Sequence, residues 1–248
     1  MRRFVTAAAF VLALGLAISA QTADEIIAKY VAKIGGMEKV QAVKTLRQTG
    51  KFIGGGGFEA RLIDEFRRPN VQRNEFIFQG MTGVSAFDGK TGWKIEPWGG
   101  KKDAESLSED ELKSYMDGDF DESLINYKQK NIKVEYLGKD VFEGSDVVKL
   151  RATLPSGTVK TYFLDTDYYV PIKIEVTRMV RGAEVESETI VGDYKEVGGV
   201  FFPFSYESGP KGSANKSKVV YDKIEVNVPL DDVRFARPSV HSPPTSKP

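Results

Sequence analysis

The alternation of apolar and charged residues between Phe58 and Arg67 constrains the fold more strongly than any other feature of the sequence. Even positions carry Phe58, Ala60, Leu62 and Phe66, and odd positions carry Glu59, Arg61, Glu65 and Arg67. Successive side chains of a β-strand point to opposite faces of the sheet, so this period of two predicts a strand with one apolar and one polar face. Turn sequences at 68–70 and 88–92 divide the region up to Trp98 into about three such strands.

Two charged residues, Asp64 and Arg68, interrupt the apolar side of this first strand. A charge on an apolar face is costly unless it is paired or lies at the rim of a cavity with a polar mouth. The pattern therefore predicts a curved antiparallel sheet whose concave face holds apolar material, with charge at its edge.

Further strands are expected on both sides of this region. They are predicted at 46–53, 134–137, 147–154, 159–164, 172–181, 185–194, 200–206 and 219–226. Glycine- and proline-containing turns separate the later strands at hairpin spacing, with no helical pattern between them, which favours an antiparallel meander. The predicted fold class is α+β, mainly β, with a single curved antiparallel sheet and a few short helices.

The first helix is expected at the N-terminal side of the sheet. Thr22 and Glu25 form a capping box ahead of apolar residues at helical spacing, and Gly35-Gly36 ends the helix. A short helical turn is expected over 37–43.

Two more short helices are expected in the middle of the chain. Ser108 and Glu111 form a second capping box, and a further helix is predicted from Asp121 to Tyr127. Short amphipathic helices within a β sequence need an apolar surface to lie on. We therefore expect them to cover the open side of the sheet.

Residues 1–20 have the layout of a secretory signal peptide. Arg2 and Arg3 precede an apolar run from Phe4 to Ile18, and the segment ends in the small residues Ser19 and Ala20. The run is short for a membrane span and has no stop-transfer charges after it, which disfavours an uncleaved anchor. We expect export and cleavage near Ala20.

The rest of the chain is expected to form one domain at 21–237, followed by a disordered tail at 238–248. No composition shift or repeat divides the domain. The tail is rich in serine and proline, a composition that cannot bury an apolar core.

The composition excludes several kinds of chemistry. The sequence has no cysteine, and its one histidine, His241, lies in the tail. Thiolate sites, zinc held by histidines and a serine–histidine pair are therefore excluded, and we predict no catalytic residues, no metal and no cofactor. Lysine plus arginine equals aspartate plus glutamate, which argues against nucleic acid as a partner.

Two motif-like segments have simpler explanations. Gly89-Lys90-Thr91 resembles the end of a phosphate-binding loop, but a strand rather than a helix is expected after it, so a hairpin turn fits better. The alternating acids Asp117, Asp119 and Asp121 lack the glycine and glutamate that a calcium loop requires. Helix capping and solvation account for these acids.

Arg68 is the residue whose position most favours a function. It is either a strand-end arginine bonded to a local carbonyl, or a rim cation that anchors a cover helix or a polar headgroup. The aromatic and apolar side chains near it are first of all core candidates. They would also line a cavity if the open sheet has more apolar face than two short helices cover. The candidate lipid-binding residues are Phe66, Arg68, Phe76, Phe78, Trp93, Leu112, Tyr115 and Met116.

Several short motifs, taken in order, resemble a known family. They comprise the first helix with its terminal Gly35-Gly36 and the segments 43–47, 67–70, 87–93, 120–121, 124–128, 163–165 and 171–175. Over 22–236 this order is similar to that of the outer-membrane lipoprotein-sorting proteins, the periplasmic carriers similar to LolA and LolB.

The resemblance implies an unclosed antiparallel β-barrel with helices as a lid. The cavity between them would take up lipoprotein acyl chains or another lipid in the periplasm, for transfer toward the outer membrane. It also implies loading by an inner-membrane ABC transporter and delivery to an outer-membrane acceptor. Arg68, before Pro69, matches the arginine that holds the lid in such carriers.

Other functions remain open at this level. One is a periplasmic envelope-stress sensor module of the same fold, and another is a structural envelope protein with a filled core and no ligand. A hydrolase with a carboxylate pair is a further class, but no pair of acids with a base partner is placed in the sequence.

Overall fold

The computed structural model describes residues 22–118 and 120–238. The expected signal peptide lies outside the described residues, as does the tail from residue 239 onward. Within the described parts of the chain, no helix has the length and apolar character needed to span a membrane.

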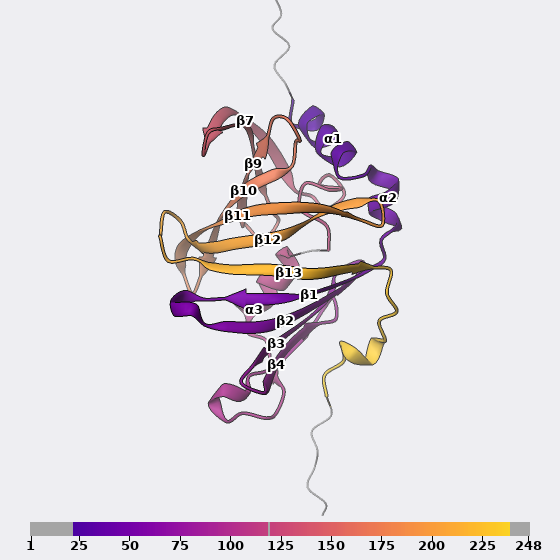
Figure 1. Cartoon of the computed structure of the whole chain (residues 1–248), viewed down its shortest axis with the longest axis vertical. Coiled ribbons are helices and arrows are strands. Elements are labelled where there is room, and N and C mark those ends of the chain that lie inside the picture. Colours follow the sequence, from indigo (N-terminus) through magenta and orange to yellow (C-terminus); the bar gives the residue numbers. More distant parts are fainter. Residues whose placement is uncertain (1–21, 119, 239–248) are drawn as a thin grey trace, which may run out of the picture.

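One antiparallel sheet of 13 strands makes up most of the molecule (Figure 1). The first arm contains β1 (Thr45–Ile53), β2 (Glu59–Arg67), β3 (Val71–Phe78), β4 (Met81–Phe87), β5 (Gly92–Ile95) and β6 (Glu105–Ser106). The second arm contains β7 (Lys133–Phe142), β8 (Ser145–Thr153), β9 (Val159–Asp165), β10 (Pro171–Val180), β11 (Ala183–Val197), β12 (Val200–Pro210) and β13 (Ser217–Val226). The predicted strands and the mainly β fold class are confirmed, and the region around Phe58–Trp98 holds four strands.

The strand order decides where the middle of the chain must run. β1 pairs with β13 at the centre of the sheet, and the order extends outward from there to β6 at one edge and β7 at the other. The sheet is therefore not closed into a barrel. Because β6 and β7 are consecutive in the chain yet lie at opposite edges, the residues between them have to cross from one edge of the sheet to the other.

The crossing segment begins with α3 (Glu109–Asp117), which has the predicted capping box between Ser108 and Glu111. Farther along, the chain forms a series of turns over residues 123–131. The helix predicted at Asp121–Tyr127 is therefore wrong, because Asn126 adopts a left-handed conformation (φ 53°) that ends helical continuation. We call residues 108–131 the cover.

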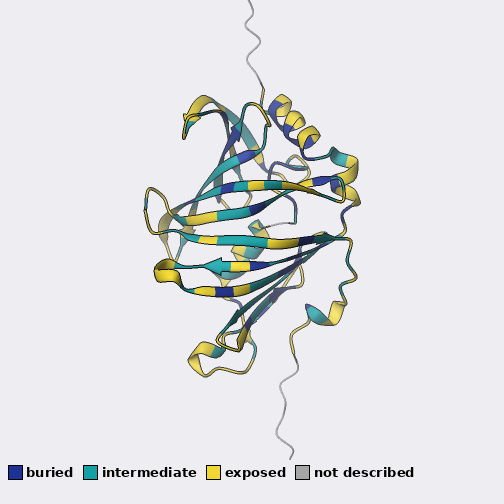
Figure 2. Ribbon diagram, in the orientation of Figure 1, coloured by how far each residue is buried: buried dark blue, intermediate teal, exposed yellow. Residues whose placement is uncertain are grey.

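The helices α1 (Ala23–Lys33) and α2 (Met37–Ala42) precede the sheet, as predicted. The Thr22 capping box is present, and the apolar stripe of α1 is buried while its other side is exposed (Figure 2).

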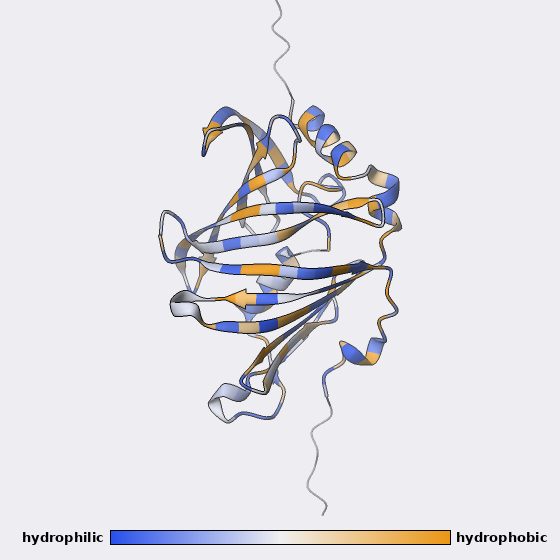
Figure 3. Ribbon diagram, viewed as in Figure 1, coloured by the Kyte–Doolittle hydropathy of each residue, from blue (hydrophilic) through white to orange (hydrophobic). Residues whose placement is uncertain are grey.

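The main core lies beneath α1 and the second half of the cover. There α1 and cover residues such as Leu124 and Ile125 pack on β8 and β9. A smaller cluster of Leu46, Phe204 and Ile224 lies near the centre of the sheet. Apolar and polar residues alternate along the central strands (Figure 3), as a sheet with two unlike faces requires.

The charged residues at odd positions of β2 lie on the outer face of the first arm. This face is partly covered by protein. Glu65, which the alternation places on the polar face, is only 1% exposed. Its carboxylate accepts hydrogen bonds from Arg47 (2.9 Å) and from Arg234 (2.7 Å). The C-terminal residues 227–237 run beside this arm (Figure 1) and bury the pair of bonds, so the expectation of a wet face is wrong at this position.

Trp93 lies on this same outer face. The strand register aligns Trp93 with Ala86, Ala86 with Arg73, and Arg73 with Glu65, so their side chains share one side of the sheet. The indole N–H of Trp93 donates to the carbonyl of Phe235 at 2.9 Å. Trp93 therefore anchors the C-terminal segment.

The contact between Arg234 and Glu65 can be tested by substitution. We expect Arg234→Met to lower the free energy of unfolding by about 1–3 kcal/mol, because it removes a charge-assisted hydrogen bond from a buried carboxylate. Urea denaturation measures the change. The control is Arg237→Met, whose guanidinium bonds at the surface to Ser106 and Ala104. An equal effect of both substitutions would contradict the buried role of Arg234.

Candidate functional site

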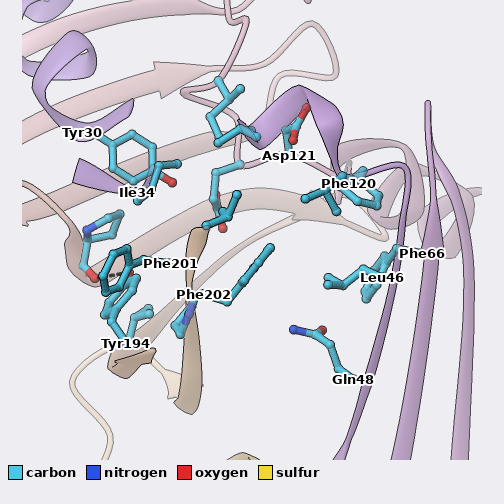
Figure 4. A pocket seen from close by; sticks show the side chains of 18 of the residues that line it. Tyr30, Ile34, Leu46, Gln48, Phe66, Phe120, Asp121, Tyr194, Phe201 and Phe202 are labelled. Atoms are coloured by element: carbon cyan, nitrogen blue, oxygen red, sulfur yellow. Dashed lines mark hydrogen bonds between the residues drawn. The ribbon is translucent and has the colours of Figure 1, made fainter. Parts of the chain in front are cut away.

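A pocket lies between the cover, α1, and strands from both arms of the sheet. It has a volume of about 290 Å³ and a predominantly apolar lining. Figure 4 shows side chains from both arms converging on it, with Leu46 and Phe66 on one side and Tyr194, Phe201 and Phe202 on the other. Its size lies at the lower end of the roughly 300–1,000 Å³ typical of small-molecule sites.

Arg68 joins the cover to the rest of the protein at this pocket. Its guanidinium donates to the carbonyls of Val40 (2.9 Å) and Val43 (2.7 Å), at and just after α2. It also pairs with the carboxylate of Asp121 in the cover, where one hydrogen bond measures 2.7 Å. Arg68 therefore binds the cover and two distant carbonyls at once, which matches the rim-cation interpretation better than a bond to a local carbonyl.

The ion pair is largely shielded from water. The side chain of Arg68 is 20% exposed and that of Asp121 is 7% exposed. The ring of Phe120 lies 4.3 Å from the guanidinium carbon of Arg68, close enough for a cation–π contact. Phe120 also lines the pocket, so the residues that hold the cover are part of the pocket wall.

The first half of the cover is attached by polar side chains of the inner face, the face opposite Trp93 and Glu65. Gln72 donates to the carbonyls of Tyr115 (3.1 Å) and Gly118 at the end of α3. The hydroxyl of Tyr115 contacts Asn74 (3.0 Å) and Ser85 (2.6 Å) on β3 and β4. α3 therefore lies on the inner face mainly through hydrogen bonds.

Asp64, the acid on the predicted apolar parity, belongs to this polar layer. It accepts hydrogen bonds from Asn74 (2.8 Å) and Tyr221 (2.6 Å). Burial raises the pKa of Asp64, and these two hydrogen bonds offset only part of that rise. The cost of a charge on this face is met by hydrogen bonds, with no cation bonded to the carboxylate among the described residues.

Glu111 adds a charged attachment at the start of α3. Its carboxylate accepts from Lys94 of β5 (2.7 Å) and from the backbone N–H of Ser108 (2.8 Å). Partial burial would raise the pKa of Glu111, but the hydrogen bonds from Lys94 and Ser108 outweigh it and lower the pKa to about 2.

The fold is similar to those of several proteins of known structure. No protein-family model and no curated protein matches the sequence. A domain of an outer membrane lipoprotein-sorting protein from Vibrio parahaemolyticus matches with a TM-score of 0.59 and 15% identity, covering 85% of this chain and 94% of that one. A LolA superfamily protein from Nitrosomonas europaea matches with a TM-score of 0.57 and 12% identity, covering 88% and 98%. A DUF1329 family protein from Desulfovibrio piger matches with a TM-score of 0.60 and 10% identity, covering 88% and 98%.

This chain has the LolA-type fold. Each of these matches covers most of both chains, so the likeness extends to the whole unclosed sheet. The resemblance expected from the sequence is confirmed at the level of the fold.

The candidate lipid-binding residues do not all lie at one site in this structure. Phe66 and Arg68 line the pocket. Phe76 and Phe78 lie farther along the inner face in an aromatic cluster with Phe52, Phe58 and Trp98. Whether a lipid contacts any of them stays a prediction.

The remaining candidates are divided between the cover and the outer face. Leu112 is half-buried in α3, and Tyr115 faces the polar layer of the inner face. Met116 points away and is 63% exposed, in a surface groove with Pro69 and Ile132. Trp93 lies on the outer face and does not reach the pocket, because its parity is that of Glu65.

Several residues that line the pocket of this protein were interpreted from the sequence only as core or strand residues. They are Tyr30, Ile34, Gln48, Val191, Tyr194, Phe202 and Tyr206. Tyr30 and Ile34 belong to the apolar stripe of α1. That stripe predicts which side of the helix is buried, but it does not reveal that the buried side borders a cavity.

The coupling between Arg68 and Asp121 is measurable. Arg68→Met leaves a buried carboxylate without its counter-ion, and we expect a loss of about 3–5 kcal/mol in unfolding free energy. A double-mutant cycle with Asp121→Asn should give a coupling energy of about 1–3 kcal/mol.

The matched control is the exposed pair Lys51 and Glu59, whose N–O distance is 3.8 Å. Its coupling should stay below about 1 kcal/mol because solvent screens it. Additive effects at Arg68 and Asp121 would show that the cover is not held by their interaction.

The attachment of α3 through Glu111 should depend on pH. A carboxyl group whose pKa is lower in the folded state stabilises the fold above its unfolded pKa, and this contribution is lost as pH falls through the folded value. The difference in urea midpoint between wild type and Glu111→Gln should be present at neutral pH and should disappear as the pH falls from about 4.5 to about 2. Glu109→Gln, in the same helical turn, is the control, and a pH-independent difference at Glu111 would contradict the charged attachment.

Proposed function

We propose that this protein is a periplasmic lipid carrier that holds the acyl chain of a lipoprotein or another lipid in the pocket beneath the cover. The observation that carries the proposal is the apolar pocket itself, which is bounded on one side by a segment that crosses the open face of the sheet. Its fold is shared with a domain described as an outer membrane lipoprotein-sorting protein and with a protein described as a member of the LolA superfamily, which supports the same function.

The energetics of such binding are favourable. Each methylene that moves from water into an apolar cavity contributes about 0.8 kcal/mol, so five buried methylenes contribute about 4 kcal/mol. That corresponds to roughly a thousandfold in affinity. An acyl chain alone can therefore supply useful affinity, provided that the pocket admits it.

Release requires a second state in which the pocket opens or shrinks. The cover is suited to this because its first half is attached by exchangeable hydrogen bonds, through Gln72, Tyr115 and Glu111. Its second half contains the buried Leu124 and Ile125 and stays with the core. We propose that α3 moves and takes with it Gly118 and Phe120, which line the pocket, while the turns after residue 121 remain in place.

The partners follow from the same proposal. An exported carrier that receives its lipid at the inner membrane and delivers it at the outer membrane needs a donor, such as an ABC transporter, and an acceptor. The apparent signal peptide at 1–20 supports export. No catalytic role is assigned to the pocket.

Lipid binding is tested on protein purified under non-denaturing conditions. Native mass spectrometry should show a bound lipid, and extraction identifies it. Val191→Phe places a larger side chain in the pocket wall and should reduce lipid occupancy at least tenfold. Val141→Phe, at an exposed strand position, is the control and should keep full occupancy.

The outcome of this test separates the alternatives. Loaded protein that passes its lipid to acceptor vesicles supports a carrier. Absence of lipid, or undiminished binding in a folded Val191→Phe variant, would refute the proposal and leave a sensor or structural protein. Circular dichroism confirms that the variant is folded.

A further inference from the structure

The pocket wall contains polar side chains to which the protein gives no partner. Gln48 is 7% exposed and Tyr30 is 5% exposed, and both line the pocket. Among the described residues, neither the Gln48 amide nor the Tyr30 hydroxyl has a hydrogen bond within the protein, and no fully enclosed polar side-chain atom lacks a partner. Their polar ends therefore reach the surface of the cavity. Figure 4 shows Tyr30 and Gln48 on opposite sides of it.

An unpaired polar group in such a setting needs an explanation. Leaving a buried donor or acceptor without a partner costs about 1–3 kcal/mol, and most buried polar groups in proteins are bonded. Leucine and phenylalanine would fill the same two positions without that cost. The partners of Gln48 and Tyr30 therefore come from what fills the pocket, which is water when no ligand is bound and the ligand when one is.

Two further polar groups face the same space. The hydroxyl of Tyr206 has no hydrogen bond to any described residue. One carboxylate oxygen of Glu122 accepts from the hydroxyl of Tyr162 at 2.9 Å, and no cation pairs with Glu122 in the described part of the chain. Burial raises the pKa of Tyr30 and Tyr206, and the negative charge of Glu122 raises both further, so these hydroxyls stay protonated at neutral pH.

Two cations line the pocket, and they differ in their partners. Arg68 is paired with Asp121, and the ammonium of Lys160 donates to the backbone carbonyl of Asp117 at 3.1 Å. That carbonyl is neutral, so among the described residues Lys160 keeps an unpaired positive charge, as Glu122 keeps an unpaired negative one. The four charged residues of the lining, Arg68 and Lys160 against Asp121 and Glu122, therefore sum to zero, and a ligand carboxylate or phosphate would add an unbalanced negative charge. A ligand hydroxyl can donate to Glu122 or to the Gln48 carbonyl oxygen, and it can accept from either tyrosine.

We propose that the pocket selects amphiphiles with an uncharged, hydroxyl-bearing polar group, and that Tyr30, Gln48, Tyr206 and Glu122 form its polar subsite. The proposal rests on the lipid-binding function proposed above and narrows its ligand class. The apolar wall binds the chain, and the polar subsite discriminates between headgroups.

A series of ligands with the same chain and different heads tests the selection. Decanol, decanoate and decylammonium are compared at neutral pH by displacement of an environment-sensitive fluorophore from the intact protein. We expect decanol to bind at least about tenfold more tightly than decanoate, because decanoate adds a negative charge to a pocket lining whose own charges sum to zero.

Substitutions that remove only polar atoms identify the subsite. Tyr30 and Gln48 lie on opposite sides of the cavity, so the one hydroxyl of decanol bonds to one of them. Either Tyr30→Phe or Gln48→Leu should therefore weaken decanol about three- to tenfold, the range expected for one hydrogen bond. Both should leave the affinity of the apolar fluorophore unchanged. Tyr168→Phe is the control, since Tyr168 is exposed outside the pocket and its variant should bind decanol as wild type does.

Each other outcome overturns a defined part of the argument. Decanoate binding as tightly as decanol, or decanol binding unchanged in both variants, refutes the polar subsite while lipid binding stands. Decylammonium binding most tightly, with loss of that preference in Glu122→Gln, refutes the uncharged headgroup in favour of a cationic one. Failure of all three ligands and of the fluorophore to bind refutes the proposed function itself.

Discussion

The interaction on which the arrangement of the site depends is the ion pair between Arg68 and Asp121. The strand order forces residues 108–131 to cross the inner face, because β6 and β7 end at opposite edges of the sheet. Crossing alone does not fix where the segment lies. Arg68 does so by bonding two carbonyls near α2 and the Asp121 carboxylate at the same time. A guanidinium suits this task because its planar array of five donors stays charged when partly buried.

The two faces of the first arm follow from the same period-two alternation, yet each is covered by a different part of the chain. The inner face meets α3 through a layer of amides, hydroxyls and the carboxylate of Asp64. The outer face meets the C-terminal segment through Glu65, Arg234 and Trp93. Polar attachments of both kinds are directional and add specificity, whereas the apolar core beneath α1 supplies most of the burial. The described residues of this core include none from α3.

The sequence predicted the strands, the mainly β class and both capping boxes because each of these depends on local spacing. It was less informative where distant segments meet. The burial of Glu65 and the bond from Trp93 to the C-terminal segment were missed, because parity says which residues share a face, not which later segment covers that face. The helix predicted at Asp121–Tyr127 is wrong because Asn126 adopts a left-handed conformation, which the spacing of apolar residues does not reveal. Of the candidate site, Phe66 and Arg68 reach the pocket, whereas Gln48 and Tyr30 were interpreted only as strand and helix positions.

The polar residues of the pocket allow an otherwise apolar cavity to select ligands by hydrogen bonding as well as by size. An apolar wall distinguishes ligands mainly by chain length and volume, and one methylene is worth only about 0.8 kcal/mol. A hydrogen-bonding group that is left unpaired by the wrong ligand discriminates more strongly, because its desolvation is not repaid. In the release that we propose, α3 moves while Tyr30 on α1 and Gln48 on β1 stay in place. A headgroup bound to them would therefore remain positioned while the cover opens, so that release begins with the acyl chain and ends with the polar group.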